Sequence, residues 1–437
     1  MNLKTRIGNS RLAQDSLWAV CGNGLGYGLL LLAGIVIARY LGKDIYGEYG
    51  LVKTTMIYIA GFATLGLGIS STKYIADALQ TDRAHVRALA RDALTLSFWF
   101  SLTLAFAVAA AATPLARFLK EPGLTMAFRV LAVIIIFKAL NTTQNGILAG
   151  FGAFRSIARN NVASGAVMLA SCWPLTWWLG LDGAFISLAA SQGLNALLNY
   201  FSLRRHTGAL TGQESVSRRR ELFLFSFPIA LQELNYTVCN WGGIALLTKL
   251  SSVGQVGIYT ATMQWNGIIT FIPGLLSNVI LSHLSGTTGN ARAHRHTLRT
   301  MLGVNFITTL IPFVVIYILA GWIAGFYGPT FTEMKGVMRV LMLATIFSAC
   351  ATVLYHELLS RGHNWLLLGY RIFQDAVILG LTWVLLLQRP AFPGSDGAMY
   401  YAIGYVSGAL IYFSILLITV KAVNRKQDNR TIKAQTD

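Results

Sequence analysis

Apolar stretches about as long as a membrane is thick recur along the whole of this 437-residue chain. A helix that crosses a bilayer needs ~20 mostly apolar residues. Charged residues make up only 12% of the chain, whereas soluble domains carry about 25%. We therefore predict an all-α polytopic membrane protein with about twelve transmembrane helices. The expected spans lie near 16–38, 50–72, 93–115, 126–149, 160–179, 183–203, 223–249, 259–284, 300–322, 336–359, 365–387 and 397–420.

The two halves of the chain match each other at a nearly constant offset. Polar and glycine positions take part, which chance similarity between two apolar sequences explains poorly. The matches pair Arg39 with Lys249, Tyr49 with Tyr259, Arg129 with Arg339 and Asp182 with Asp396. Parallel repeats of membrane helices build many secondary transporters. We predict an N-terminal lobe over 1–205, a linker over 206–222, a C-terminal lobe over 223–421 and a tail over 422–437.

The formal net charge of +18 follows the order of the expected spans. Basic residues concentrate in alternate connectors, most densely between Arg204 and Glu221, and at both termini. By the positive-inside rule, those connectors and both termini are cytoplasmic. Topology thus accounts for the charge without a nucleic-acid partner, and we expect a bacterial inner membrane protein. The stretch from Lys73 to Asp92 is either a surface amphipathic helix or an extension of the second span.

Signatures of catalysis are missing from the sequence. It holds no Gly-x-x-x-x-Gly-Lys-Ser/Thr loop, and His356-Glu357 lacks the second histidine of a zinc helix. The four cysteines all lie in apolar stretches, as small buried residues do. No connector is long enough for an enzyme domain. We predict a transporter with no catalytic residue and no metal site.

Polar residues inside the spans gather on helical faces. In 126–149, Lys138, Asn141 and Asn145 recur at intervals of three and four residues. Such faces avoid lipid, so they line a wet cavity between the halves or hold helices together. The amides that we assign to the cavity are Asn141, Asn145, Gln192, Asn195, Asn240, Gln264 and Asn266.

Two charges lie close to the predicted midplane. Lys138 and Glu233 are each on the order of 15–18 Å into their spans. An isolated charge there costs roughly 2.5–3.5 kcal/mol, so water, a partner or a substrate must compensate it. One alternative is a single interhelical ion pair that fixes packing.

Two further acid–base pairs have the i, i+4 spacing of ion pairs within one helix. Arg371 and Asp375 either neutralise each other or face the cavity. Glu357 and Arg361 lie near a cytoplasmic span end, where a structural pair is the simpler interpretation.

Four segments carry a family resemblance across the chain. The connector 39–50, RYLGKDIYGEYG, resembles the "LG…YG.Y" connector of bacterial polysaccharide-export flippases of the O-antigen type. These belong to the multidrug/oligosaccharidyl-lipid/polysaccharide (MOP) superfamily. Segments 66–76, 150–155 and 257–259 are similar to the same family.

The resemblance implies two six-helix lobes around a central lumen, a MATE-like fold, with the spans 16–38, 50–72, 223–249 and 259–284 forming the gate. It implies transfer of a polyprenyl-diphosphate-linked oligosaccharide from the cytoplasmic to the periplasmic leaflet by alternating access. Basic side chains suit a diphosphate, and we expect these to be Arg39, Lys53, Lys138, Lys249 and Arg371. Arg39 and Lys249 alternatively only reach toward headgroups.

The sequence also suggests which ion could drive transport and which molecules the protein could contact. No cofactor is expected beyond H+ or Na+ as coupling ion, with Glu233 and Asp375 as acidic candidates and Glu233 as the proton carrier. The alternative is a multidrug/cation antiporter, which would need acids deep in the first lobe; the span 16–38 has none. Expected partners are the lipid-linked glycan, membrane lipid and a polysaccharide polymerase or assembly protein. We expect a monomer.

Overall fold

The computed structural model describes residues 11–81, 84–208, 219–286, 291–361, 363–388 and 397–436, and every regular element in these ranges is helical. The first half contains α2 (Arg11–Ala63), α3 (Leu67–Thr81), α4 (Ala84–Phe118), η1 (Pro122–Leu124), α5 (Thr125–Gly150) and α6 (Phe154–Gly208). The second half contains α7 (Arg219–Leu250), α8 (Val253–Gly286), α9 (Ala291–Tyr327), η2 (Pro329–Phe331), α10 (Met334–Leu341), α11 (Leu343–Ser360), α12 (Asn364–Leu387) and α13 (Gly397–Thr436).

Eight helical stretches of the described residues are long and apolar enough to cross a membrane. Two of them, in α2 and α6, have 44 and 55 residues, about twice the length of one crossing. Each breaks once, at Gly42 (φ 71°) and at Gly180 (φ 57°). Glycine adopts this left-handed region without a steric penalty. Each glycine therefore divides its helix into two legs, the helical segments before and after the break. The helix α6 therefore holds two expected spans, while α2 holds the first expected span and the beginning of the second. The predicted polytopic all-α class is confirmed.

The second expected span, 50–72, is not continuous. The helix stops after Ala63 and restarts at Leu67, because Leu65 (φ 52°) and Gly66 (φ 69°) both have positive φ. Farther on, α3 continues to Thr81. The amphipathic stretch beginning at Lys73 is thus an extension of the second span followed by the start of α4, the simpler of the two alternatives.

The chain forms two compact units, residues 1–245 and 246–437. Unit 1 holds α2 to α6 and most of α7, and unit 2 holds the remaining helices. The division falls inside α7, while residues 209–218 of the predicted linker lie outside the described ranges. The lobe boundaries follow the sequence repeat and stay a prediction.

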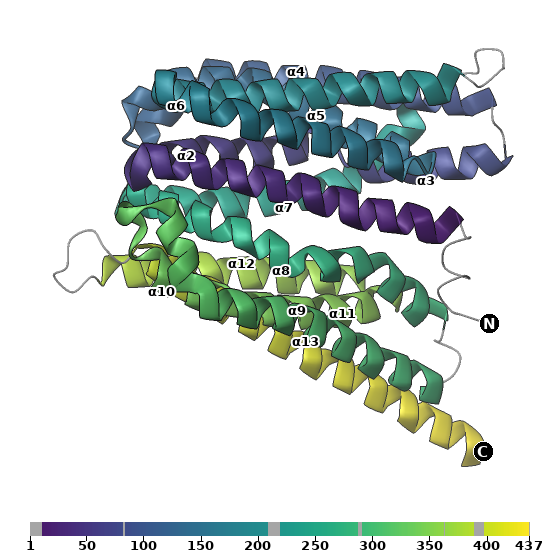
Figure 1. Cartoon of the computed structure of the whole chain (residues 1–437). Helices are drawn as coiled ribbons and strands as arrows, with labels where there is room; N and C mark the ends of the chain where they lie inside the picture. The colour runs from purple at the N-terminus through teal and green to yellow at the C-terminus, as the bar shows by residue number, and fades with distance from the viewer. Residues whose placement is uncertain are drawn as a thin grey trace, which may run out of the picture. The chain divides into compact units, whose positions relative to one another are not determined.

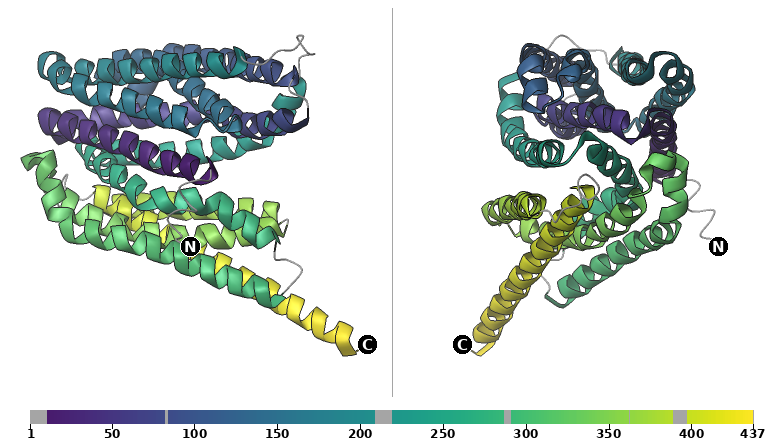
Figure 2. Two further views of the ribbon diagram at one scale, coloured as in Figure 1. Left: turned by 45° about the vertical axis from the view of Figure 1, so that its right-hand side comes forward. Right: turned by 90° about the vertical axis from the view of Figure 1, so that its left-hand side faces the viewer.

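Within unit 1 the helices lie side by side with nearly common axes (Figures 1 and 2). Glycines set how closely they approach. A side chain at Gly22 of α2 would overlap Ala158 of α6, and one at Gly146 of α5 would overlap the backbone of Gly68 in α3. Thr72 Oγ1 donates to the Gly146 carbonyl across the same contact (2.9 Å). These glycines serve close helix packing.

The helix α7 runs antiparallel to α2 and α3 inside unit 1. As the residue number falls from 241 to 226 on α7, the number of its partner rises from 55 to 70. The contacts are Trp241 with Thr55 (Nε1 to Oγ1, 3.1 Å), Thr237 with Tyr58 (Oγ1 to O, 3.0 Å), Glu233 with Gly61, Ala230 with Leu65, and Ser226 with Ser70 (Oγ to Oγ, 2.7 Å).

Unit 2 is built around α11, which packs on α8, α9 and α13. The helix α13 continues through the predicted tail and projects past its neighbours (Figure 1). Equivalent details recur in the two halves of the chain. The short turns η1 and η2 precede α5 and α10. The matched Tyr49 and Tyr259 pack on Phe185 (5.5 Å) and Tyr401 (4.7 Å) between ring centroids. The structure therefore supports the repeat.

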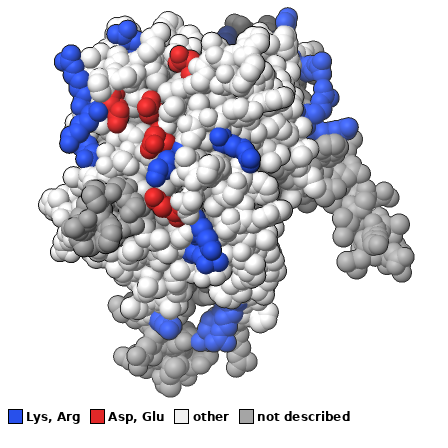
Figure 3. Space-filling view, turned by 60° about the vertical axis from the view of Figure 1, so that its left-hand side comes forward, with Lys and Arg blue, Asp and Glu red and all other residues white. Residues whose placement is uncertain are grey.

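The surface suits a lipid environment. Figure 3 shows a face on which uncharged side chains cover most of the area between scattered charged ones. Large apolar residues such as Phe106, Trp178, Ile318 and Trp365 are exposed. Hydrocarbon tails would cover these side chains in a membrane.

Candidate functional site

Two lysines from different helices of unit 1 form a like-charged pair. Lys53 comes from the second leg of α2 and Lys138 from the middle of α5, and both are partly buried. The Lys53 Nζ lies 5.6 Å from the ring centroid of the buried Tyr49. The helices α2 and α5 pack against each other, so the two ammonium groups share one region of unit 1. Because like charges repel strongly where water is scarce, the pair would be stabilised by an anion.

The ion pairs of the described residues leave this lysine pair without a carboxylate. The pairs nearest in kind join His294 and Arg361 to Glu357, and Arg371 to Asp375, and none within the described ranges joins Lys53 or Lys138 to a carboxylate. The alternative of a Lys138–Glu233 ion pair is therefore not realised within the described ranges. Lys53 and Lys138 remain a cationic centre inside a bundle of apolar helices.

Glu233 lies on the face of α7 that packs against α2. A side chain at Gly61 would come 3.5 Å from Glu233 Oε2, so the carboxylate sits beside this glycine. One turn farther along, the rings of Tyr236 and Tyr58 meet edge to face at 5.7 Å. The carboxylate is half-buried, and the break between α2 and α3 follows Gly61 by about one turn.

The predicted cavity amides of α5 and α6 hydrogen-bond to one another. The network joins α5, both legs of α6 and the first leg of α2. Its bonds run from Asn141 Nδ2 to Gln192 Oε1 (3.0 Å), Asn199 Nδ2 to Asn145 Oδ1 (3.1 Å) and to Asn195 Oδ1 (2.9 Å), Asn195 Nδ2 to Asn161 Oδ1 (2.9 Å), and Asn161 Nδ2 to Asn23 Oδ1 (2.9 Å). These amides thus hold helices together, and their contact with a substrate stays a prediction.

Four amides of this network were absent from the candidate site: Asn23, Asn161, Asn199 and Asn160, whose Nδ2 donates to Asn199 Oδ1 (2.8 Å). Asn160 and Asn161 begin an apolar span, and Asn23 interrupts the glycine-rich start of the chain. The cost of placing amides in or beside an apolar run in lipid was the available signal. Sequence does not reveal that they face one another.

Other predicted residues lie apart from the lysine pair or in unit 2. Arg39 is exposed, and its neighbour Tyr40 accepts a hydrogen bond from Trp173 Nε1. Asn240 Nδ2 donates to the carbonyl of Tyr236 in its own helix (2.8 Å). Lys249, Gln264, Asn266, Arg371 and Asp375 belong to unit 2.

The expected pair on α12 is present but loose. Arg371 Nε lies 3.6 Å from Asp375 Oδ2, and the arginine side chain is 39% exposed. The carboxylate is buried. This pair within one helix neutralises at least part of each charge. The roles of Arg371 in substrate binding and of Asp375 in coupling stay predictions.

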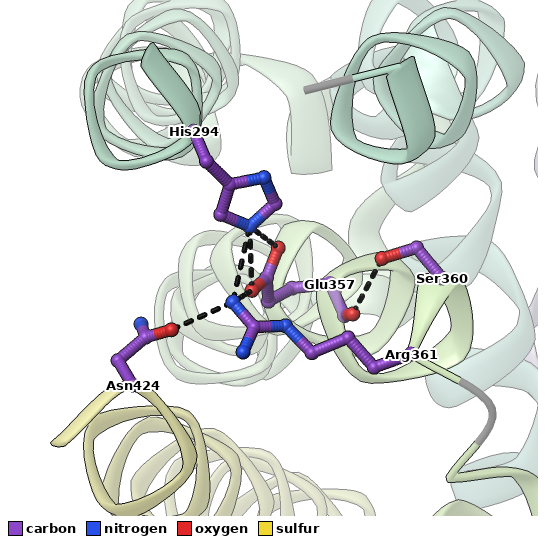
Figure 4. A network of polar contacts seen from close by, with 5 residues as sticks. All are labelled: His294, Glu357, Ser360, Arg361 and Asn424. Carbon is purple, nitrogen blue, oxygen red and sulfur yellow. Dashed lines mark hydrogen bonds and ion pairs between the residues drawn. The ribbon is translucent and has the colours of Figure 1, made fainter. Parts of the chain in front are cut away.

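A tighter network surrounds the second expected pair (Figure 4). Glu357 of α11 is fully buried and forms ion pairs with Arg361 and with His294 Nε2 (2.8 Å) of α9. Arg361 Nη2 also donates to Asn424 Oδ1 of α13 (2.6 Å). The expected Glu357–Arg361 pair is confirmed. His294 and Asn424 were missed because they lie more than 60 positions away from Glu357 and Arg361.

Comparisons with known proteins agree with the architecture. Residues 12–282 match the family described as "Polysaccharide biosynthesis protein". The chain is 22% identical over 365 residues to the "EPS I polysaccharide export inner membrane protein EpsE" of Ralstonia nicotianae, and 21% identical to the protein of that name from Ralstonia solanacearum. Each alignment covers 82% of both proteins.

Solved structures show the same fold. An inward-facing multidrug resistance MATE family transporter of the MOP superfamily aligns with a TM-score of 0.80 and 18% identity, over 92% of this chain and 96% of that one. A MOP superfamily transporter from Pyrococcus furiosus Vc1 aligns with a TM-score of 0.67 and 16% identity, over 94% and 95%. The predicted two-lobe MATE-like fold is confirmed. The chain belongs to the polysaccharide biosynthesis protein family, and it is a multi-pass membrane protein with the fold of MOP superfamily transporters.

Proposed function

We propose that this protein flips a polyprenyl-diphosphate-linked oligosaccharide, an O-antigen or exopolysaccharide repeat unit, from the cytoplasmic to the periplasmic leaflet. The observation that carries the proposal is the pair Lys53 and Lys138, which has no carboxylate partner within the described ranges. A diphosphate brings the negative charge that this pair lacks. Ammonium groups form short charge-assisted hydrogen bonds with phosphate oxygens. The same groups would repel an organic cation.

The glycan part of the substrate is supported by the relatives. Both Ralstonia proteins are named as polysaccharide export proteins, and the family is named for polysaccharide biosynthesis. A sugar chain needs a wet path, whereas a polyprenyl tail is stable in hydrocarbon. The headgroup would thus pass through the protein while the tail stays in the bilayer.

The proposed direction rests on charge. Basic residues concentrate at the two ends of α6, in the stretch from Arg204 to Glu221 and at both termini. The positive-inside rule places these segments in the cytoplasm. The lipid-linked unit would enter from that side and leave on the periplasmic side as the two lobes alternate.

Glu233 is the proposed coupling group. It is half-buried on α7, beside Gly61, and no ion pair of the described residues includes it. A carboxylate without a fixed cationic partner can exchange a proton or hold Na+ as its surroundings change. Protonation removes its charge before α7 moves relative to lipid or water.

The decisive test is a flipping assay with the full chain in proteoliposomes. A fluorescent polyprenyl-diphosphate oligosaccharide is supplied on one side, and a membrane-impermeant glycosidase reports its arrival on the other. Lys53→Ala and Lys138→Ala each remove a charge-assisted contact of ~1.5–3 kcal/mol, which corresponds to a roughly ten- to hundredfold slower transfer. Lys335→Ala, which removes an exposed lysine of α10, is the matched control and should transfer normally.

Two outcomes would overturn the proposal. Normal transfer in the Lys53→Ala/Lys138→Ala double variant would remove the lysine pair from the substrate path. Movement of an organic cation by the wild type, with no transfer of the glycan, would favour the multidrug antiporter.

Coupling is tested separately with Glu233→Gln. We expect transfer that no longer responds to an imposed pH gradient, because the amide does not titrate. Unchanged gradient dependence would exclude Glu233 as the proton carrier and would leave the lysine pair as it stands.

A further inference from the structure

A second cationic feature lies in unit 1, at the end of α6. The two legs of this helix reverse at Gly180, so its first and last turns return to the same end of the bundle. There they line a half-open cavity of about 390 Å³, within the range of roughly 300–1,000 Å³ typical of ligand pockets. Its seven described lining residues are Arg155, Ser156, Arg159, Asn160, Ser202, Arg205 and His206, and none is acidic.

The floor of this cavity is polar and fixed by hydrogen bonds. Asn160 is only 6% exposed. Its Nδ2 donates to Asn199 Oδ1 (2.8 Å) and to Ser202 Oγ (3.0 Å), which joins the two legs. The floor therefore continues the amide network and is built into the packing of α6.

His206 is oriented on the wall of the cavity. Its Nδ1 lies 2.8 Å from the carbonyl oxygen of Ser202. A carbonyl only accepts, so Nδ1 carries the proton and Nε2 is left for other contacts. The ring also packs on Phe151, with 5.6 Å between centroids. Nearby, Arg87 Nη2 donates to the carbonyl of Thr207 (3.0 Å), which fixes the end of the second leg on α4.

We propose that this cavity binds a phosphate-bearing anion, with Arg159 and Arg205 as the principal ligands. A guanidinium matches phosphate oxygens in a bidentate geometry. The first turn of α6 adds the positive end of a helix dipole. The last turn of α6 carries the negative end of its helix dipole, and the positive charge of Arg205 together with His206 offsets it. The site is separate from Lys53 and Lys138, and it does not rest on the proposed glycan substrate.

Membrane topology alone does not account for this arrangement. The positive-inside rule requires basic residues in a connector, but it does not require them to surround a hydrogen-bonded cavity. Arg204 shows the difference. It adds the same charge and is exposed, as Arg159 and Arg205 are, yet it does not line the cavity.

The same phosphate chemistry has two sources, a lipid headgroup or a soluble phosphate. Two measurements on the full-length protein distinguish them. In nanodiscs of neutral phosphatidylcholine, calorimetric titration with inorganic pyrophosphate measures binding of the soluble group. In detergent, native mass spectrometry measures retention of phosphatidylglycerol against phosphatidylcholine.

The variant Arg159→Gln/Arg205→Gln is compared with Arg204→Gln/Arg299→Gln, which removes the same charge from equally exposed positions that do not line the cavity. The cavity variant should lose at least about tenfold in pyrophosphate affinity, in lipid retention or in both. The control should stay within about twofold of the wild type. Arg159→Lys/Arg205→Lys, which keeps the charge but loses the bidentate geometry, should lie between them.

Results that support the proposal also distinguish between the two sources of the phosphate group. Loss in the titration alone indicates a soluble phosphate, and loss in lipid retention alone indicates a headgroup. Absence of wild-type binding in both measurements would overturn the proposal, as would equal losses in the cavity variant and the control. If the glutamine variant fails to fold, undiminished binding by the lysine variant would also count against the two guanidinium groups.

Discussion

The buried network of Glu357 and Arg361 provides the sharpest stability prediction, through the change Arg361→Gln. In the wild type, the arginine side chain is 13% exposed and contacts Glu357, His294 and Asn424. Its loss leaves the fully buried Glu357 carboxylate with His294 as its remaining partner. Breaking a buried pair from one side costs ~3–5 kcal/mol. Because His294 still contacts the carboxylate, we expect about 3 kcal/mol, or roughly a hundredfold in the unfolding equilibrium.

The chain offers a matched control for this change. Arg371→Gln removes an arginine from the other i, i+4 pair, where the arginine is 39% exposed and its nitrogen lies 3.6 Å from the carboxylate. Exposed pairs contribute about 0–1 kcal/mol, so this variant should lose no more than about 1 kcal/mol. The assay is equilibrium unfolding of the full-length protein in mixed micelles with increasing dodecyl sulfate, followed by tryptophan fluorescence.

A double variant tests the physical reason. Arg361→Gln/Glu357→Gln removes the uncompensated charge along with its partner, so it should be more stable than Arg361→Gln alone. The reasoning is refuted if the double variant is the less stable of the two, or if Arg361→Gln and Arg371→Gln have the same effect.

Three further predictions follow from helix packing in unit 1. Gly146→Val should lower stability by ~1–3 kcal/mol in the same unfolding assay, because the new side chain would enter the backbone of the facing helix; a neutral effect would contradict the close approach. Ser70→Cys/Ser226→Cys, in a variant without the native cysteines, should form a disulfide that gel mobility detects, because the two hydroxyl oxygens are 2.7 Å apart. Failure to cross-link under mild oxidation would reject the antiparallel register of α7. Asn195→Leu removes three amide contacts of ~0.6 kcal/mol each, so a loss of about 2 kcal/mol is expected, and an increase in stability would argue against the amide network.

The fold was predictable because membrane insertion depends on local composition. A span must satisfy its backbone internally and present apolar side chains, so ~20-residue apolar runs locate it without tertiary information. The reversals at Gly42 and Gly180 fall between expected spans for the same reason. The break at Leu65 and Gly66 was not predicted, because the apolar run passes through it without a composition change.

The candidate site was only partly predictable. The i, i+4 spacing of Glu357 and Arg361 identified a pair within one helix, since helical geometry alone brings those side chains together. The polar face of α5 was also recognisable from spacing. Sequence could not decide whether that face meets water or other amides, because the answer depends on how neighbouring helices are rotated.

The sequence by itself determined the apolar spans, their repeat and the residues too polar to face lipid. Only the tertiary structure decided how those residues are matched. It paired the amides of α5 and α6 with each other and added His294 and Asn424 to the Glu357–Arg361 pair. It also left Lys53 and Lys138, on the packed helices α2 and α5, without an ion-pair partner among the described residues. The physical reason is distance along the chain. Composition acts within one helix, whereas contacts between residues such as Ser70 and Ser226, separated by 156 positions, arise only when whole helices pack.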